Sequence, residues 1–190
     1  KVFLPENVPL DALGKFIILE LYTGLSEGAR ETGSDLIKFS NARVFLNGSE
    51  KNNAFIIIQD FNDFAHDESL AMLKNGQNFT VVLHSNSPKE DCASVGTDFR
   101  QGAYLATKHL LSLGHTRIAL MTSKITNPWH TGRFEGYVDA LKKAGLDLDW
   151  QLVKETDGYI EEDRQALDQL FALRHPPTAV FAGNDTRGFN

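Results

Sequence analysis

Cysteine is almost absent from this chain, which has only Cys92 among its 190 residues. A single cysteine excludes an internal disulfide and is typical of a reducing compartment. Long apolar stretches are also missing, since no run approaches the roughly 18 residues of a membrane-spanning helix. The amino terminus lacks the charged-then-apolar pattern of a signal peptide. We therefore expect a cytoplasmic protein with no membrane partner, although a mature exported protein would have the same composition.

Positive charge is scarce, with 19 lysines and arginines against 25 aspartates and glutamates and a net charge of −6. A DNA-binding module normally carries a basic patch, so this composition does not predict a nucleic-acid surface. The sequence contains no glycine-rich phosphate loop. His109 and His115 lie six residues apart, which is not the spacing of metal ligands on a helix face, and Cys92 has no partner base nearby. We expect no metal, no cofactor and no enzymatic activity.

The most informative stretch runs from Val95 to Tyr137. Within it, Asp98 can cap a helix that ends at Gly114. Residues 117–122 (RIALMT) form a short apolar run typical of a buried strand in a parallel sheet. The polar residues 123–131 then predict a loop at the carboxyl end of that strand, which is where ligands bind in open α/β sheets.

Strand and helix patterns alternate along the whole chain, which predicts an α/β fold of parallel sheets flanked by helices. The expected strands are 2–4, 35–40, 54–58, 79–84, 117–122, 152–153 and 178–182. The expected helices are 16–30, 67–75, 98–114, 133–144 and 161–173. We expect residues 1–114 to form one lobe and residues 115–190 to form a second. Because no flexible linker separates them, the two lobes should be joined by direct strand crossings.

Several motifs in the chain occur in the order of a known family. The pattern D-x-x-x-G-x-x-x-A-x-x-H-L-x-x-x-G-H-x-R-I-A is followed by R-x-x-G-Y at 133–137 and by PPTAVFAGND at 176–185. Together they resemble the effector-binding core of the lactose-repressor/galactose-repressor (LacI/GalR) family of transcriptional regulators. The first motif is carried by Asp98, Gly102, Ala106, His109, Leu110, Gly114, His115, Arg117, Ile118 and Ala119.

The resemblance implies a two-lobed fold like that of a periplasmic sugar-binding protein, with a ligand cleft between the lobes. It also implies that the chain is truncated or has omitted segments. Family members have a full helix where residues 41–53 stand, and their second lobe continues beyond the position of Asp185.

Arg133 and Asp185 are the first two candidate ligand contacts. Each follows a predicted strand, so both side chains would converge on one crevice if the strands are parallel neighbours. Arginine offers a rigid fork of donors and aspartate a pair of acceptors, which suits the vicinal hydroxyls of a sugar or nucleoside. The alternative is a salt bridge between Arg133 and Asp185 without a ligand, and the two interpretations are compatible.

Four further residues are candidates, Tyr159 and Gln101 through the resemblance and Trp129 and Asn127 through their place in the chain. Tyr159 would pack against the ligand ring, or would be an ordinary half-exposed tyrosine. Trp129 and Asn127 lie on the loop that leads to Arg133, where the tryptophan could instead cover the hinge. Gln101 would face the crevice from the first lobe, or would be a solvated helix residue.

The resemblance predicts the effector-sensing part of a transcriptional repressor, with a sugar as the expected effector. Family members act as homodimers that contact operator DNA through helix-turn-helix modules, which this chain does not contain. A periplasmic sugar-binding protein of a transporter is the alternative, because it shares the fold. The sequence does not distinguish hexoses, pentoses, glycosides and nucleosides, nor induction from co-repression, and it does not specify an operator.

Overall fold

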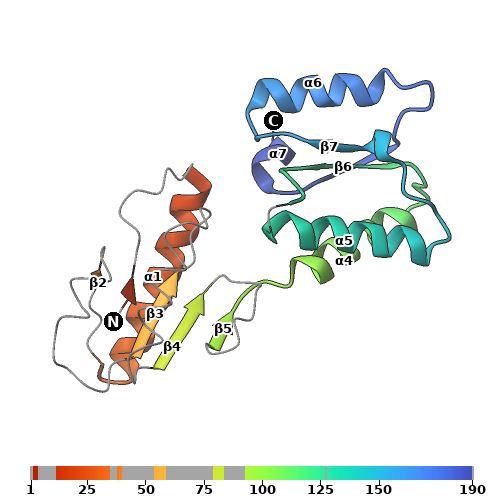
Figure 1. The fold of residues 1–190 in the computed structure, drawn as a ribbon. Coiled ribbons are helices and arrows are strands. Elements are labelled where there is room, and N and C mark those ends of the chain that lie inside the picture. The colour runs from red at the N-terminus through yellow and green to blue at the C-terminus, as the bar shows by residue number, and fades with distance from the viewer. Residues whose placement is uncertain are drawn as a thin grey trace. The chain divides into compact units, whose positions relative to one another are not determined.

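The computed structural model describes residues 2–3, 12–34, 38–39, 54–58, 79–83, 93–126 and 128–189. The chain divides into two compact units, Lys1–Thr97 and Asp98–Asn190 (Figure 1).

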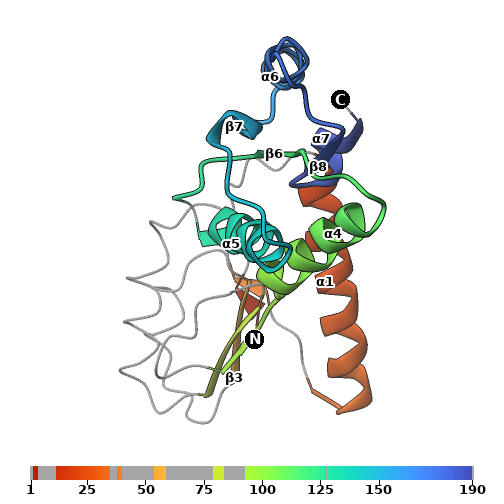
Figure 2. The ribbon, with the colours of Figure 1, turned by 90° about the vertical axis from the view of Figure 1, so that its right-hand side faces the viewer.

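The first unit contains a parallel sheet of five strands in the order β2-β1-β3-β4-β5. The strands are β1 (Val2–Phe3), β2 (Lys38–Phe39), β3 (Ala54–Ile58), β4 (Phe79–Leu83) and β5 (Ala93–Val95). Helix α1 (Ala12–Glu31) lies on one side of these strands (Figure 2). The parallel pairing expected from the alternating pattern is therefore confirmed.

Helix α1 begins at Ala12, four residues before the start predicted from the sequence. The expected helix 16–30 therefore starts too late, because the residues from Ala12 onward, including Gly14, are already helical. A single glycine inside a helix costs only about 1 kcal/mol, which the rest of a 20-residue helix offsets. The expected end at residue 30 is confirmed to within one residue, since α1 ends at Glu31 and Gly33 just beyond it adopts a left-handed φ of 63°.

Two sequence-based expectations for the first unit lie outside the described residues. They are the short connection at 41–53 and the helix at 67–75. Within the described part of the chain, no helix is long and apolar enough to cross a membrane.

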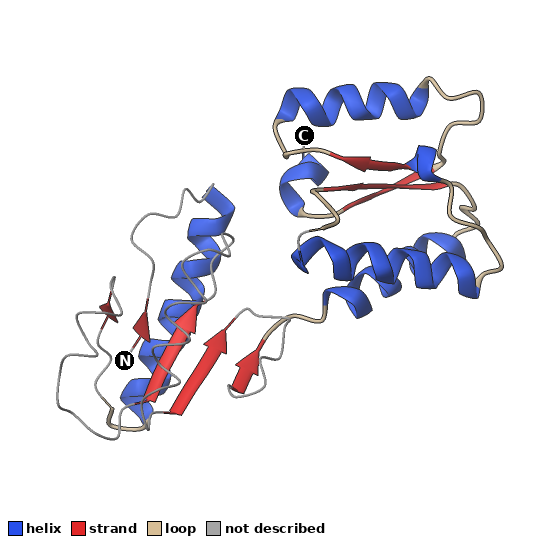
Figure 3. Cartoon of the chain, viewed as in Figure 1, coloured by secondary structure: helices blue, strands red, loops and turns tan. Residues whose placement is uncertain are grey.

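The second unit is a three-layered α/β structure around a parallel sheet of order β7-β6-β8. The strands are β6 (Ile118–Thr122), β7 (Val153–Glu155) and β8 (Ala179–Ala182). Helix α6 (Ile160–Phe171) covers one face, while α4 (Phe99–Ser112) and α5 (Pro128–Lys143) cover the other (Figures 1 and 3). A short helix, α7 (Asp185–Phe189), follows β8.

The core of the second unit is built on both faces of β6, all five residues of which are buried. Ala119 and Met121 pack towards α6, while Ile118 and Leu120 pack towards α5. The residues that complete the two clusters are Leu152, Ala166 and Leu170 on the α6 side and Tyr137 and Leu141 on the α5 side. Because both faces of the strand are buried, its sequence is a continuous apolar run rather than an alternation of apolar and polar residues.

Helices α4 and α5 pack closely along each other. A Cβ atom placed on Gly136 of α5 would collide with the backbone of Arg100 and Tyr104 in α4, so the contact requires glycine. The Arg100 guanidinium also forms ion pairs with Asp139, at 2.8 Å, and with Glu135, at 3.3 Å. This packing groups α4 with the second unit, whereas the boundary predicted from the sequence lies after it, between residues 114 and 115.

Candidate functional site

The candidate site lies at the carboxyl edge of the β7-β6-β8 sheet. Ser123 follows β6, Thr156 follows β7, and Asn184 and Asp185 follow β8. Since the three strands are parallel, these polar residues leave the sheet at the same edge. This edge is where open α/β sheets place their ligands.

Arg133 reaches this edge from helix α5. Its guanidinium carbon lies 3.9 Å from the centroid of the Phe99 ring, a cation–π contact that holds the side chain half-buried. Burial lowers the pKa of Arg133, the positive charge of Arg187 lowers that pKa further, and the carboxylate of Asp185 opposes both. Arg133 and Asp185 therefore act on each other electrostatically, as expected if both face one crevice. Their role as ligand contacts stays a prediction.

Asp185 is the first residue of α7 and is exposed. A carboxylate at a helix N-terminus is favourably placed relative to the partial positive charge of the helix dipole. The sequence did not predict α7, but it correctly placed Asn184 and Asp185 just beyond the carboxyl end of β8.

The other candidate residues are distributed differently. Tyr159 directly precedes α6, and its residue surface is 70% exposed, so its ring is accessible. Gln101 is exposed on α4, and its backbone N–H donates to the Asp98 carboxylate at 2.8 Å. Asp98 is thus confirmed as a helix cap.

Trp129 lies in the first turn of α5, where only its backbone is described, and Asn127 lies outside the described residues. The sequence predicted a loop through residue 131, which is wrong because α5 already begins at Pro128. Proline is favoured at the first helical position, where its fixed φ suits the helix and its missing N–H is not needed.

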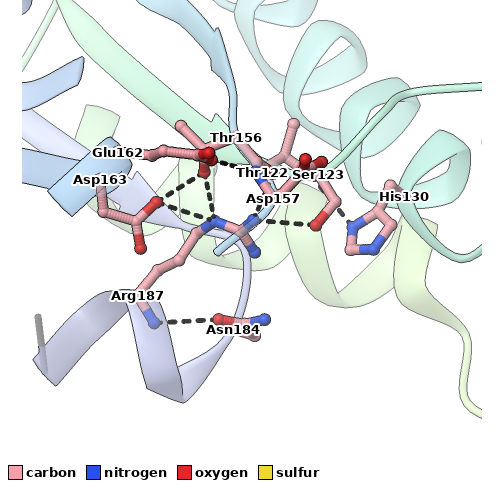
Figure 4. Close-up of polar contacts among 9 residues, drawn as sticks. All are labelled: Thr122, Ser123, His130, Thr156, Asp157, Glu162, Asp163, Asn184 and Arg187. Atoms are coloured by element: carbon pink, nitrogen blue, oxygen red, sulfur yellow. Dashed lines mark hydrogen bonds and ion pairs between the residues drawn. The ribbon is translucent and has the colours of Figure 1, made fainter. Parts of the chain in front are cut away.

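A buried polar cluster at the same edge was not predicted from the sequence (Figure 4). Its centre is Arg187, whose guanidinium donates to Ser123 Oγ at 2.8 Å and to the Thr156 carbonyl oxygen at 2.7 Å. The Arg187 Nε atom lies 3.5 Å from an oxygen of Asp163, and both side chains are 1% exposed. Arg187 therefore connects α7, α6 and the segments that follow β6 and β7.

Neighbouring contacts complete this cluster. The Thr156 hydroxyl donates to Asp163 Oδ1 at 2.6 Å, and the Asp157 backbone N–H donates to Glu162 Oε2 at 2.9 Å. Gly158 adopts a left-handed φ of 86°, and a Cβ there would approach the Arg187 guanidinium at 3.3 Å. The loop before Tyr159 thus rests against the buried arginine.

His130 adds an uncharged imidazole to the edge. Burial, followed by the positive charges of Arg133 and Arg187, lowers the pKa of His130 to about 4. Its Nδ1 atom lies 3.2 Å from the hydroxyl oxygen of the fully buried Thr122, so these two groups share a hydrogen bond. At neutral pH the histidine is therefore neutral and can donate with one ring nitrogen and accept with the other.

One sequence signal could have revealed the buried cluster. Asp163 precedes Ala166 by three residues and Leu170 by seven, so it lies on the apolar face of the predicted helix. A charged residue on such a face requires a buried partner. The partner, Arg187, lies 24 residues further along the chain, and no periodicity connects the two.

Comparison with known proteins places this chain in a family. Residues 45–190 match the family described as periplasmic binding proteins and sugar binding domain of the LacI family. The chain belongs to this family. The resemblance found in the sequence motifs is therefore confirmed.

Curated relatives within the LacI family are transcriptional regulators. The chain is 26% identical to the HTH-type transcriptional repressor PurR of Mannheimia succiniciproducens over 155 residues, which are 81% of this chain and 45% of the relative. It is 32% identical to the HTH-type transcriptional regulator DegA of Bacillus subtilis over 123 residues, which are 64% of this chain and 36% of the relative. The chain thus spans less than half the length of either relative.

Solved LacI-family structures share the fold. A regulatory protein of the LacI family from Chloroflexus aggregans superposes with a TM-score of 0.77 at 20% sequence identity. The match covers 98% of this chain and 68% of the Chloroflexus chain. A LacI family transcriptional regulator from Enterococcus faecium, solved with bound ribose, superposes with a TM-score of 0.72 at 26% sequence identity. The match covers 99% of this chain and 67% of the Enterococcus chain. These similarities confirm the expected periplasmic-binding-protein-like α/β fold.

Proposed function

We propose that this chain is the effector-sensing part of a LacI-type transcriptional regulator and that its effector is a sugar. The observation that carries the proposal is the placement of Arg133 in α5, with its guanidinium over the Phe99 ring, and of the exposed Asp185 at the start of α7, after neighbouring parallel strands. Two groups of opposite charge, delivered to one edge by separate elements, form the kind of preorganised pair that binds vicinal hydroxyls.

The other groups at the edge suit the same ligand class. The accessible Tyr159 ring offers an apolar surface for the face of a sugar ring, and the neutral His130 adds a polar group without net charge. Trp129, Asn127 and Gln101 remain proposed contacts. The ribose bound by the Enterococcus faecium regulator is consistent with a sugar effector.

Regulation would follow from a shift between protein conformations. An effector that binds one arrangement more tightly moves the population towards it by its difference in affinity. In a homodimer this shift would change how two helix-turn-helix modules, supplied by parts of the protein outside these 190 residues, meet operator DNA. The named functions of PurR and DegA support this cytoplasmic, non-enzymatic role over that of a transporter's periplasmic sugar-binding protein.

The test is a thermal-shift screen of the full-length protein against sugars, sugar phosphates and nucleosides. A ligand at 100 times its dissociation constant stabilises the native state by about 2.7 kcal/mol, enough for a clear rise in melting temperature. Arg133→Ala should abolish the shift. Arg164→Ala is the matched control, because Arg164 is an exposed arginine of α6 with no proposed role in ligand binding.

Each outcome of the screen has a distinct meaning. A shift that Arg133→Ala removes and Arg164→Ala preserves supports both the effector class and the site. A shift that survives Arg133→Ala keeps the sensor but refutes the site. If no compound on the panel shifts the wild-type protein, the sugar-effector proposal is refuted.

A further inference from the structure

We propose that Arg187 is a positioning residue for the effector site, because its buried guanidinium fixes the segments that present Asp185 and Tyr159. The proposal rests on the function proposed above for this edge. It concerns a residue that makes no ligand contact itself, since the Arg187 side chain is only 1% exposed.

The first argument is the distribution of the contacts that Arg187 makes. It donates to Ser123 after β6, to Thr156 after β7 and, through an ion pair, to Asp163 of α6, while its own helix α7 follows β8. A single guanidinium thus links the segments that leave all three strands of the β7-β6-β8 sheet. Arginine suits this role because its planar fork donates in several fixed directions at once.

The second argument is the closeness of Arg187 to the proposed ligand contacts. Asp185 lies two residues earlier in α7, and the backbone N–H of Arg187 donates to Asn184 Oδ1 at 3.0 Å. The backbone of Gly158 also lies against Arg187, because a Cβ atom added to this glycine would be 3.3 Å from the guanidinium. Tyr159 is the next residue, so the same contact helps to fix its position. Movement of Arg187 would therefore displace both proposed contacts.

The third argument is the electrostatic state of the cluster. Burial lowers the pKa of Arg187, and the carboxylates of Asp163, Asp157 and Glu162 oppose that change. A charge enclosed in this way is costly to move, because any displacement separates it from its partners in a poorly solvated environment. The cluster should therefore hold the three segments in one arrangement before an effector arrives.

A purely structural ion pair would also stabilise the fold, so the test must separate local from global effects. Arg187→Lys keeps the positive charge but loses the planar fork, and Ser123→Ala removes a single acceptor of that fork. Leu141→Ala is the control, since Leu141 lies on α5 and is buried in the apolar core between that helix and the sheet. All variants are made in the full-length protein.

The first measurement is amide hydrogen exchange of the unliganded protein. Arg187→Lys and Ser123→Ala should speed exchange about tenfold in segments 123–126, 156–159 and 184–187, which is the effect of losing one charge-assisted hydrogen bond. Exchange in α4 and in the second half of α5 should be unchanged. Leu141→Ala should instead speed exchange only in the second half of α5, beyond the turn that carries Arg133. Uniform acceleration, or none, in the Arg187→Lys protein would overturn the positioning role.

The second measurement is affinity, with D-ribose as the first probe and the strongest compound of the thermal-shift panel as the second. Both are measured well below the melting temperature of each variant. Arg187→Lys should weaken binding at least tenfold, while Leu141→Ala should leave it unchanged; loosened segments with unaltered affinity would refute the proposal. If the wild-type protein binds no panel compound, the proposed function fails, whereas the exchange experiment still decides the role of Arg187.

Discussion

Two buried regions of the second unit are stabilised in different ways. Beneath α6 lies an apolar cluster that includes Met121, Leu152 and Leu170. At the carboxyl edge of the same sheet lies the polar cluster, whose central pair, Arg187 and Asp163, is equally buried. The first depends on removing apolar surface from water, which requires no particular direction. The second depends on hydrogen bonds and an ion pair, each of which requires fixed geometry.

This difference predicts where the structure tolerates change. Apolar side chains can be exchanged for others of similar volume with little loss, since their contacts are not directional. A buried charge cannot lose its partner without exposing the other group to a medium that solvates it poorly. The polar cluster should therefore be the more fragile region, and it lies beside the proposed effector site.

The largest effect is expected when the buried ion pair is broken from one side. Asp163→Ala should lower the free energy of unfolding by about 3–5 kcal/mol, because it leaves the Arg187 charge uncompensated. Chemical denaturation of the full-length protein measures this change. The double variant Asp163→Leu with Arg187→Met should recover much of the loss. Equal destabilisation in the single and double variants would show that the charge is not the cause.

A loss of about 2–5 kcal/mol is expected from Leu170→Ala, since Leu170 is fully buried and its truncation leaves a cavity. Its neighbour Phe171 is 59% exposed, so Phe171→Ala on the same helix should change stability by no more than about 0.5 kcal/mol. Denaturation curves of the two variants give the comparison. A large effect of Phe171→Ala would mean that this ring packs against a surface in the native protein.

The same contrast explains what the sequence could predict. Strand 117–122 was predicted almost residue for residue, because apolar burial leaves a continuous pattern in the sequence itself. The contributions of Arg133 and Asp185 to one edge were also predictable, since each follows a strand and parallel strands end together. Both inferences use information that is local in the chain.

The Arg187 cluster could not be predicted in this way. Ser123 and Thr156 would be ordinary in solvated loops, and although Asp163 lies on the apolar face of its helix, no pattern in the chain connects it to Arg187. The early start of α5 was missed for a related reason. Pro128 was taken as a loop residue, whereas a proline at that point equally starts a helix, and only the tertiary structure decides between the two.

A pH-dependent effect of intermediate size is expected from His130. The folded pKa of about 4 lies below the unfolded value near 6.5, so the unfolded state binds more protons between these limits. Stability should therefore fall as the pH decreases from 6.5 to 4. The full shift corresponds to about 3 kcal/mol, which screening of a half-exposed group reduces to roughly 1–2 kcal/mol.

Denaturation at pH 7 and pH 4.5 measures this effect. His130→Asn keeps a hydrogen-bonding side chain near Thr122 but does not titrate, so the part of the pH dependence that comes from His130 should disappear. If the wild-type protein and the variant lose stability equally, the imidazole does not have the depressed pKa that its surroundings indicate.

The smallest effect is expected at the exposed counterpart of the buried pair. Arg100 contacts Asp139 at 2.8 Å, a shorter distance than the 3.5 Å between Arg187 and Asp163, but its side chain is 57% exposed. The attraction raises the pKa of Arg100 through the Asp139 hydrogen bond, yet water and salt screen exposed pairs strongly. Arg100→Ala should therefore leave the melting temperature unchanged within error at 150 mM salt. If Arg100→Ala destabilised the protein as much as Asp163→Ala, then distance, rather than burial, would determine the strength of ion pairs in this protein.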